Sequence, residues 1–175
     1  METPAPATAD VSDLAGGDVA MDARIRAVWR GARVVGPAFT VRTPPGEHPA
    51  VKRALEQAAP GDVIVIDGGS CVERALWGDR MALRAQELGV AGVVIDGAVR
   101  DVAQVEELAF PLFAITSVPT APRSDLDGEL GGIITCGGRR VEPGDLVVGD
   151  DDGVVVVPRS VAAEVLRRIA GSGRG

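Results

Sequence analysis

Apolar and polar residues form two patterns that alternate along the chain. Short uninterrupted apolar runs, such as Val-Ile-Val-Ile at 63–66, are bounded by Gly, Pro and Asp, as is typical of strands buried on both faces of a sheet. Segments with helical periodicity lie between these runs. The middle of the chain contains, in order, a helix, a glycine, a buried strand, a helix and a strand, which is the pattern of β-α-β units. The sequence therefore predicts an α/β fold with parallel strands.

The predicted elements cover most of the chain. Helices are expected from Thr8 onward and over about 49–59, 79–88, 101–108 and 159–170. Strands are expected at 63–66, 92–96, 110–115, 146–148 and 154–157, with two short strands between 31 and 43 around a turn at Gly36-Pro37. The polar, Gly/Pro-rich segment 119–132 predicts a surface loop or an edge hairpin, and the last five residues predict a frayed tail.

Two Pro-Gly-Asp triplets, at 60–62 and 143–145, each precede a predicted strand. Pro and Gly in this order fit a type II turn. The recurrence is open to two interpretations, an internal repeat or the same turn chemistry used twice, and the second needs fewer assumptions. The acidic run 150–152 lacks the spacing and closing Glu of a calcium loop, so it predicts a turn between strands.

Composition limits the number of domains and the classes of partner. The 175 residues are 46% hydrophobic and only 3% aromatic, which is enough for one aliphatic core, so we expect a single domain over 1–175 with an ordered part at about 8–170. A net charge of −7 repels phosphate backbones and argues against a nucleic-acid partner. The sequence shows neither a long apolar span nor a signal peptide, so we expect a cytoplasmic protein without a membrane partner.

Few residues of the usual catalytic and metal-binding types are present. Cys71 and Cys136 are far apart without a Cys-x-x-Cys motif, so neither a zinc site nor a disulfide is expected. His48 is the single histidine and lies in the segment PPGEHP; we expect it to be a solvated loop residue, and its isolation argues against a catalytic triad. Lys52, the only lysine, lies on the early helix predicted over about 49–59. This helix is separate from the two strand–helix junctions that carry the candidate site residues, which argues against an imine mechanism. Trp77 either lines a pocket or packs under a helix.

Polar residues gather at two junctions between a strand and a helix, where ligands bind in parallel sheets. At the first, Gly78 precedes a helix whose free N–H groups, at residues 79–82, can bind a carboxylate. At the second, Arg100 and Asp101 directly follow a buried strand. The guanidinium can orient an anion while the carboxylate binds a divalent cation. From spacing alone, a helix cap at Asp101 and a surface charge at Arg100 are equally good interpretations.

The motifs along the chain resemble a known family. Twenty residues separate Gly78-Asp79 from Arg100-Asp101, and the segments TADVSD, GPAFTVR, AAPGDVIVIDGG, GVAGVVIDGAVRDV and VEPGDLVVGDDDGVVVVP occur in order. In these features the sequence is similar to the RraA-like family, which contains the regulator of ribonuclease E activity and the 4-hydroxy-4-methyl-2-oxoglutarate aldolases. The resemblance implies a three-layer β/β/α domain like the swivelling domains, assembled as a homotrimer or hexamer.

The resemblance also implies an activity and a role for each site residue. Members with this arrangement look like metal-dependent pyruvate aldolases that cleave 4-hydroxy-2-oxo acids and also decarboxylate oxaloacetate. By this resemblance, Asp101 binds Mg²⁺ or Mn²⁺, and Arg100 contacts the carbonyl or carboxylate of a small 2-keto acid. Asp79 helps to place the metal or its waters. The backbone at Gly78, Asp79, Arg80 and Met81 binds the substrate carboxylate.

Two other functions are compatible with the resemblance to different degrees. A protein-binding regulator of ribonuclease E-type RNA degradation is the alternative, because an acidic surface can mask a basic partner. A methyltransferase is disfavoured because no glycine-rich nucleoside-binding loop is visible, and 67–70 does not match G-x-G-x-x-G.

Overall fold

The computed structural model describes residues 5–171. Its helices are α1 (Thr8–Ala15), α2 (Pro49–Gln57), α3 (Asp79–Glu87), α4 (Val102–Glu107) and α5 (Arg159–Gly171). Its strands are β1 (Arg26–Ala27), β2 (Val34–Arg42), β3 (Val63–Trp77), β4 (Gly92–Val99), β5 (Leu112–Ser117), β6 (Glu129–Leu130), β7 (Ile134–Cys136), β8 (Arg139–Val141), β9 (Leu146–Asp150) and β10 (Gly153–Val157). Most of the expected frayed tail lies outside the described residues. Within 5–171, no helix is long and apolar enough to cross a membrane.

The strands form a mixed sheet in the order β1-β5-β4-β3-β2-β9-β10, with β6 beside β2 and a separate hairpin of β7 and β8. Strands β2 to β5 are parallel to one another, whereas β1, β6, β9 and β10 pair antiparallel. The α/β prediction is confirmed, and the sheet is mixed because its outer strands return through hairpins and loops, which allow antiparallel pairing.

The prediction of two short strands around Gly36-Pro37 is wrong, because β2 continues through both residues. Residues 34–37 pair with β9, and residues 38–42 pair with β3. A side chain at Gly36 would collide with the carbonyl oxygen of Gly61, and Pro37 has no N–H to donate to a ladder. These two residues therefore mark the point where one strand changes partners and joins two sheet layers.

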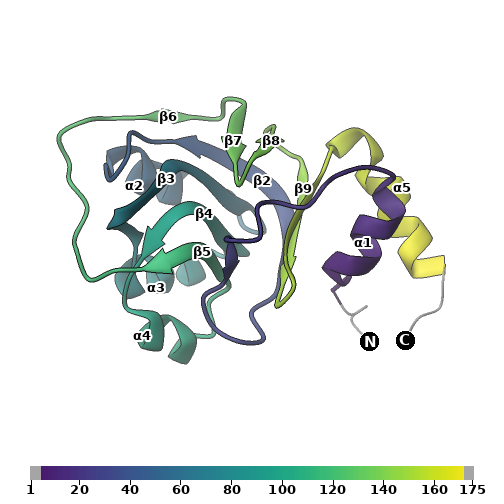
Figure 1. The fold of residues 1–175 in the computed structure, drawn as a ribbon, viewed down its shortest axis with the longest axis horizontal. Coiled ribbons are helices and arrows are strands. Elements are labelled where there is room, and N and C mark those ends of the chain that lie inside the picture. The colour runs from purple at the N-terminus through teal and green to yellow at the C-terminus, as the bar shows by residue number, and fades with distance from the viewer. Residues whose placement is uncertain (1–4, 172–175) are drawn as a thin grey trace.

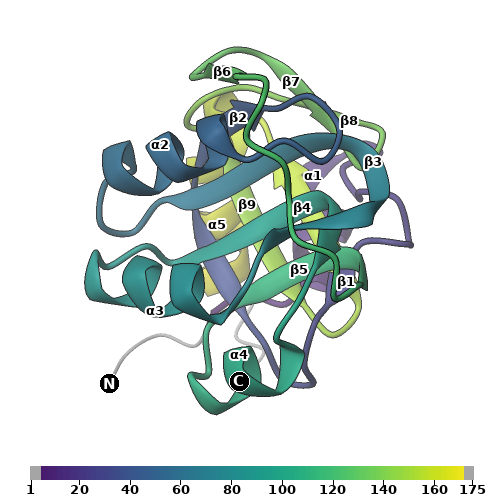
Figure 2. The same cartoon turned by 90° about the vertical axis from the view of Figure 1, so that its left-hand side faces the viewer.

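Three buried clusters separate the layers. The first fills the space between α2, α3, α4 and the parallel strands; the second lies between those strands and the layer of β7, β9 and β10; the third lies between β9, β10 and the pair α1 and α5. Figure 1 shows α1 and α5 together at one end of the molecule, and Figure 2 shows α2, α3 and α4 on one face of the sheet. The β/β/α arrangement is thus present, with the terminal helices added outside it.

Strand β3 extends far beyond the predicted 63–66. Its register with β4 shifts three times after Asp67, and Ser70 adopts a left-handed conformation with φ 55°. These irregularities let a polar stretch continue along β4 until Trp77 pairs with Val99. The extension places the residues that follow β3 beside those that follow β4.

The segment 119–128, which we call the strap, crosses the carboxyl ends of the parallel strands on its way from β5 to β6 (Figure 2). Its anchor is Glu47, which is only 1% exposed and accepts N–H groups from Asp125 and Leu126 at 2.8 and 3.1 Å. The Arg123 guanidinium also donates to Glu47 at 3.0 Å. The predicted loop or hairpin at 119–132 thus comprises this bound strap and the short strand β6.

Both Pro-Gly-Asp triplets make the same turn contact. The carboxylate of Asp62 accepts the N–H of Ala59, and the carboxylate of Asp145 accepts the N–H of Glu142, both at 2.8 Å. The strands that follow differ, because β3 runs parallel to β2 and β9 runs antiparallel to it. Shared turn chemistry therefore explains the recurrence. The run 150–152 lies at the turn between β9 and β10, as predicted.

Candidate active site

The two predicted strand–helix junctions meet in space. The N–H of Asp79 lies 3.3 Å from Oδ2 of Asp101, and the N–H of Arg100 donates to the carbonyl of Trp77 at 2.9 Å. Gly78 lies between them, where an added Cβ would stand 2.5 Å from Oδ2 of Asp101 and 3.2 Å from Cγ of Arg100. Any larger residue at this position would force the side chains of Asp101 and Arg100 to move.

Asp101 occupies the N-cap position of α4 but makes no side-chain capping bond to that helix. Its backbone is left-handed, with φ 59° and ψ 40°, a conformation that costs a non-glycine residue about 1–3 kcal/mol. Its carboxylate instead turns toward the first turn of α3 and lies 3.4 Å from Nε of Arg100. The simple helix-cap interpretation of Asp101 is therefore wrong, although its position in the chain is that of a cap.

The first turn of α3 presents backbone donors beside this carboxylate. The first bond within the helix runs from the N–H of Ala82 to the carbonyl of Gly78 at 3.0 Å, so the N–H groups of residues 79–81 precede it. The carboxylate of Asp79 accepts the N–H of Arg80 at 2.7 Å. Donors at a helix N-terminus favour a bound carboxylate because the helix dipole adds to their hydrogen bonds.

All the predicted site residues line one small, open hollow. The predicted residues Gly78, Asp79, Arg80, Met81, Arg100 and Asp101 are joined there by His48, Ala75, Leu76, Trp77 and Pro122. The strap contributes Pro122, so a segment distant in sequence forms one wall.

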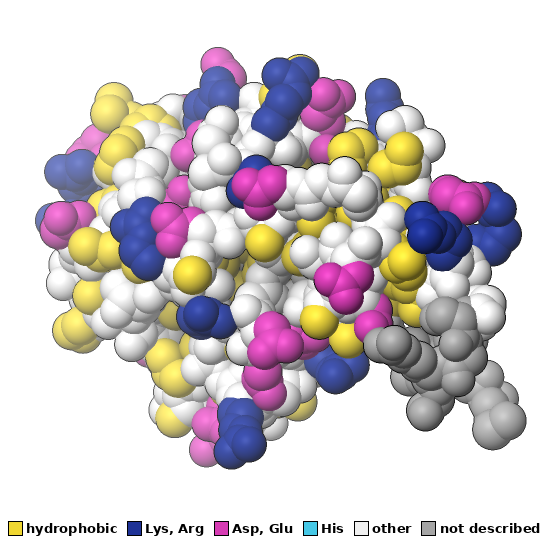
Figure 3. Space-filling view, turned by 45° about the vertical axis from the view of Figure 1, so that its right-hand side comes forward, with side chains coloured by type: hydrophobic (Ala, Val, Ile, Leu, Met, Phe, Trp, Pro, Cys, Tyr) yellow, Lys and Arg dark blue, Asp and Glu magenta, His cyan; other side chains and the backbone are white. Residues whose placement is uncertain are grey.

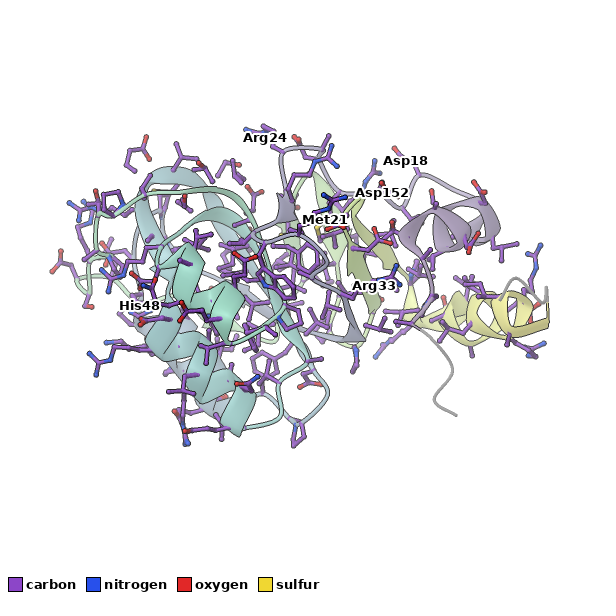
Figure 4. The ribbon with its side chains drawn as sticks, turned by 90° about the horizontal axis from the view of Figure 1, so that it is seen from below. Asp18, Met21, Arg24, Arg33, His48 and Asp152 are labelled. Atoms are coloured by element: carbon purple, nitrogen blue, oxygen red, sulfur yellow. The ribbon has the colours of Figure 1, made fainter. Side chains whose placement is uncertain are left out.

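His48 was expected to be a solvated loop residue, and this is wrong. It is half-buried against the hollow, with Nε2 2.9 Å from Sδ of Met81 and its backbone N–H donating to the carbonyl of Arg123 in the strap. Figure 4 shows it beside the teal helices, at the end of the molecule opposite α1 and α5 and well apart from Arg33 and Asp152. The sequence around it is typical of a loop, and only the fold brings that loop to the hollow.

The surroundings of His48 keep its imidazole neutral. Burial lowers its pKa from 6.5 to about 4, and the positive charges of Lys52 and Arg100 act in the same direction. A hydrogen bond to the backbone of Leu76 opposes them. At neutral pH the ring is therefore an uncharged group that can both donate and accept hydrogen bonds.

Trp77 serves as a buried wall of the hollow. It is 1% exposed and stacks on Phe110, with ring centroids 6.3 Å apart and planes inclined by 8°. Its indole N–H has no hydrogen-bond partner among the described residues. Of the two interpretations left open for Trp77, packing beneath the helices describes the side chain, although the residue also borders the hollow.

The acidic residues of the hollow suit a cation that needs few protein ligands. Within residues 5–171, no group of three or more His, Cys, Asp or Glu side chains forms a metal cage. Asp79 and Asp101 both border the hollow, and the side chain of Asp101 is 34% exposed. Mg²⁺ commonly takes one or two carboxylates and completes its shell with water and substrate oxygens. The donors present therefore fit such an ion.

Known proteins share both the sequence and the fold. The family model described as "RraA-like: Aldolase/RraA" matches residues 8–156. A Halalkalibacterium halodurans protein named "Putative 4-hydroxy-4-methyl-2-oxoglutarate aldolase" is 40% identical over 92% of this chain and 77% of its own length. The 4-hydroxy-4-methyl-2-oxoglutarate aldolase of Thermus thermophilus is 32% identical over 86% of this chain and 92% of its own.

The solved structure of the RNA-processing inhibitor RraA from Thermus superposes with a TM-score of 0.79 at 33% identity, covering 90% of this chain and 94% of that one. The fold and the hollow define a single-domain α/β protein whose pocket lies at the carboxyl ends of parallel strands. The chain belongs to the RraA-like family of aldolases and RraA proteins.

Proposed function

We propose that this protein is a divalent-metal-dependent pyruvate aldolase. It cleaves 4-hydroxy-2-oxo acids of the 4-hydroxy-4-methyl-2-oxoglutarate type to pyruvate, and it also decarboxylates oxaloacetate. The contact of 3.3 Å between the Asp79 N–H and the Asp101 carboxylate carries the proposal, because it joins a carboxylate-binding helix end to a cation-binding group and a guanidinium. The aldolase names of two relatives support it.

The chemistry needs positive charge at one oxygen. Breaking the carbon–carbon bond next to a 2-keto acid leaves the electron pair on an enolate, whose oxygen must be stabilised in the transition state. Arg100 donates to the keto oxygen or the adjacent carboxylate from a rigid fork. The substrate carboxylate binds the N–H groups of the first turn of α3 in place of the carboxylates of Asp101 and Asp79, which accept two of them in the free protein. This fixes the orientation of the bond that breaks.

The metal site is part of the proposal. Asp101 would hold Mg²⁺ or Mn²⁺ directly, and Asp79 would orient the ion or its waters. When bound, such an ion supplies Lewis-acid charge at the keto oxygen. Oxaloacetate decarboxylation produces the same enolate, so one arrangement of Arg100 and the α3 amides serves both reactions. We also propose a homotrimer or hexamer, which a mass measurement in solution tests.

Pyruvate release tests the function. The protein is assayed with oxaloacetate and with 4-hydroxy-4-methyl-2-oxoglutarate, in the presence of Mg²⁺, of Mn²⁺ or of a chelator. We expect turnover that depends on the ion and falls at least about 100-fold in Asp101→Ala, since the variant loses the ligand of the charge-stabilising ion. Glu106→Gln removes an exposed carboxylate on the same helix and serves as the matched control. Unaltered turnover in Asp101→Ala would exclude this site.

Regulation of an RNA-degrading enzyme is the second candidate function. The similarity to the Thermus RNA-processing inhibitor favours it. On the face shown in Figure 3, acidic and basic side chains are interspersed, so the net charge of −7 is not gathered in one patch of that face. A pull-down with a ribonuclease E homologue at several salt concentrations tests this role, and binding that weakens with salt would support it.

A further inference from the structure

The proposed aldol cleavage requires a proton carrier that the residues assigned so far do not supply. A base must take the proton of the C4 hydroxyl when the C3–C4 bond breaks, and an acid must then protonate C3. Asp79 and Asp101 are assigned to the metal, and Arg100 stays protonated. Of the remaining side chains that line the hollow, only His48 is an imidazole.

The ring of His48 is held in a defined orientation. Its backbone N–H is bonded to the strap at the carbonyl of Arg123, and Glu47 next to it anchors the strap further. The Leu76 backbone bonds the ring, and Nε2 contacts Sδ of Met81 at 2.9 Å. When the ring proton lies on Nδ1, Nε2 is the acceptor nitrogen, and the thioether has no hydrogen to give it. Because the Met81 side chain is flexible, a substrate hydroxyl can take its place and donate to Nε2.

The charge state of the ring suits a proton acceptor. With a pKa of about 4, set by burial and by the charges of Lys52 and Arg100, the imidazole is unprotonated at neutral pH. The charged groups that border the hollow around it are Asp79, Arg80, Arg100 and Asp101. A substrate carboxylate bound beside Arg100 offsets part of the positive charge that opposes protonation, whereas the proposed ion at Asp101 adds to that charge, so the ring stays unprotonated until the bond breaks.

On the basis of the proposed function, we propose that His48 is the general base and acid of aldol cleavage. Its free ring nitrogen accepts the C4 hydroxyl proton as the oxygen electrons form the C4 carbonyl. The electrons of the C3–C4 bond pass to the keto oxygen and form the enolate, and the carbonyl product leaves. The imidazolium then returns the proton to C3 and yields pyruvate, so atoms and charges balance.

This role separates the two activities of one site. Oxaloacetate loses carbon dioxide from a carboxylate, so no hydroxyl proton has to be removed before the bond breaks. His48 therefore takes part in breaking the carbon–carbon bond in the aldol reaction. It takes no part in breaking the carbon–carbon bond in decarboxylation. Arg100, Asp101 and the α3 amides serve both reactions.

The experiment compares His48→Asn and His48→Ala with the wild-type protein on both substrates under saturating Mg²⁺. General acid–base catalysis contributes roughly 100- to 10,000-fold, so we expect kcat for aldol cleavage to fall by at least about 100-fold. The ratio of aldol cleavage to decarboxylation should fall by a similar factor. Both variants keep the backbone bond to the strap, and circular dichroism and thermal unfolding check that they are folded.

Lys52→Gln serves as a second variant, because Lys52 lies on the exposed side of α2. Removing its charge raises the pKa of His48, so the acid limb of the aldol pH profile should move to higher pH. Equal losses of both activities in the His48 variants would show that the ring only shapes the hollow, and no loss would show that it is not used; either result overturns the inference. A wild-type protein without either activity overturns the proposed function itself, and the inference falls with it.

Discussion

Replacing Gly78 by alanine tests whether the close approach of the two junctions underlies activity. The new Cβ would stand 2.5 Å from Oδ2 of Asp101 and 3.2 Å from Cγ of Arg100. Both neighbours must move by several tenths of an ångström or more, because ordinary carbon–oxygen contacts are longer. The backbone of Gly78 is extended, with φ −154° and ψ −170°, so alanine adds a collision and not backbone strain.

The magnitude of the effect follows from this displacement. A misplacement of about 1 Å at a reacting group costs roughly 100-fold in rate, or about 2.7 kcal/mol in the barrier. Alanine is also a poorer N-cap than glycine and lowers stability by up to about 1 kcal/mol. For a chain of this length that corresponds to roughly 2–4 °C in Tm. We therefore expect a large loss of turnover with only a small loss of stability.

The assay measures kcat and KM for pyruvate release from oxaloacetate, together with thermal unfolding and Mn²⁺ affinity by titration calorimetry. Gly132→Ala is the control, because its added Cβ meets nothing within 4 Å. We expect the control to match the wild-type protein and Gly78→Ala to lose both turnover and Mn²⁺ affinity. If Gly78→Ala were folded and kept turnover within about threefold, the reasoning from the close approach would be refuted.

Two further predictions concern stability. Glu47→Gln should lower Tm at pH 7. Hydrogen bonds from the N–H groups of Leu126 and Asp125, together with the nearby Arg123 guanidinium, hold the Glu47 pKa below its usual value, although burial acts in the opposite direction. This stabilisation is present above the unfolded-state pKa of Glu47 and disappears as pH falls through its lower folded-state pKa. The Tm difference between the variant and the wild-type protein should therefore shrink in acid. A constant difference from pH 7 to pH 3 would contradict this. Trp77→Ala should lower the free energy of unfolding by about 3–5 kcal/mol, since the ring is buried and stacked on Phe110; guanidinium denaturation measures the loss, and a change below 1 kcal/mol would contradict the packing argument.

Local chemistry explains why much of the fold and half of the site could be predicted from the sequence. The run Val-Ile-Val-Ile and its counterparts have no polar face, so they must lie inside a sheet, and β4 is buried along its whole length. Gly78 directly precedes a predicted helix, and Arg100 and Asp101 follow a predicted strand. Strand ends of a parallel sheet share an edge, so their meeting could be expected.

The remaining features depend on contacts between segments that are far apart in the sequence. Local sequence patterns do not reveal such contacts. Strand β2 runs through Gly36-Pro37 only because two different strands, β3 and β9, pair with its two halves. The polar end of β3 is extended because β4 provides a partner for it. Burial of His48 depends on the strap, which is 71 residues or more away along the chain. The sequence by itself therefore determined the elements and the Gly-Asp and Arg-Asp pairs, whereas the tertiary structure alone decided where β2 changes layer and that the single imidazole borders the hollow.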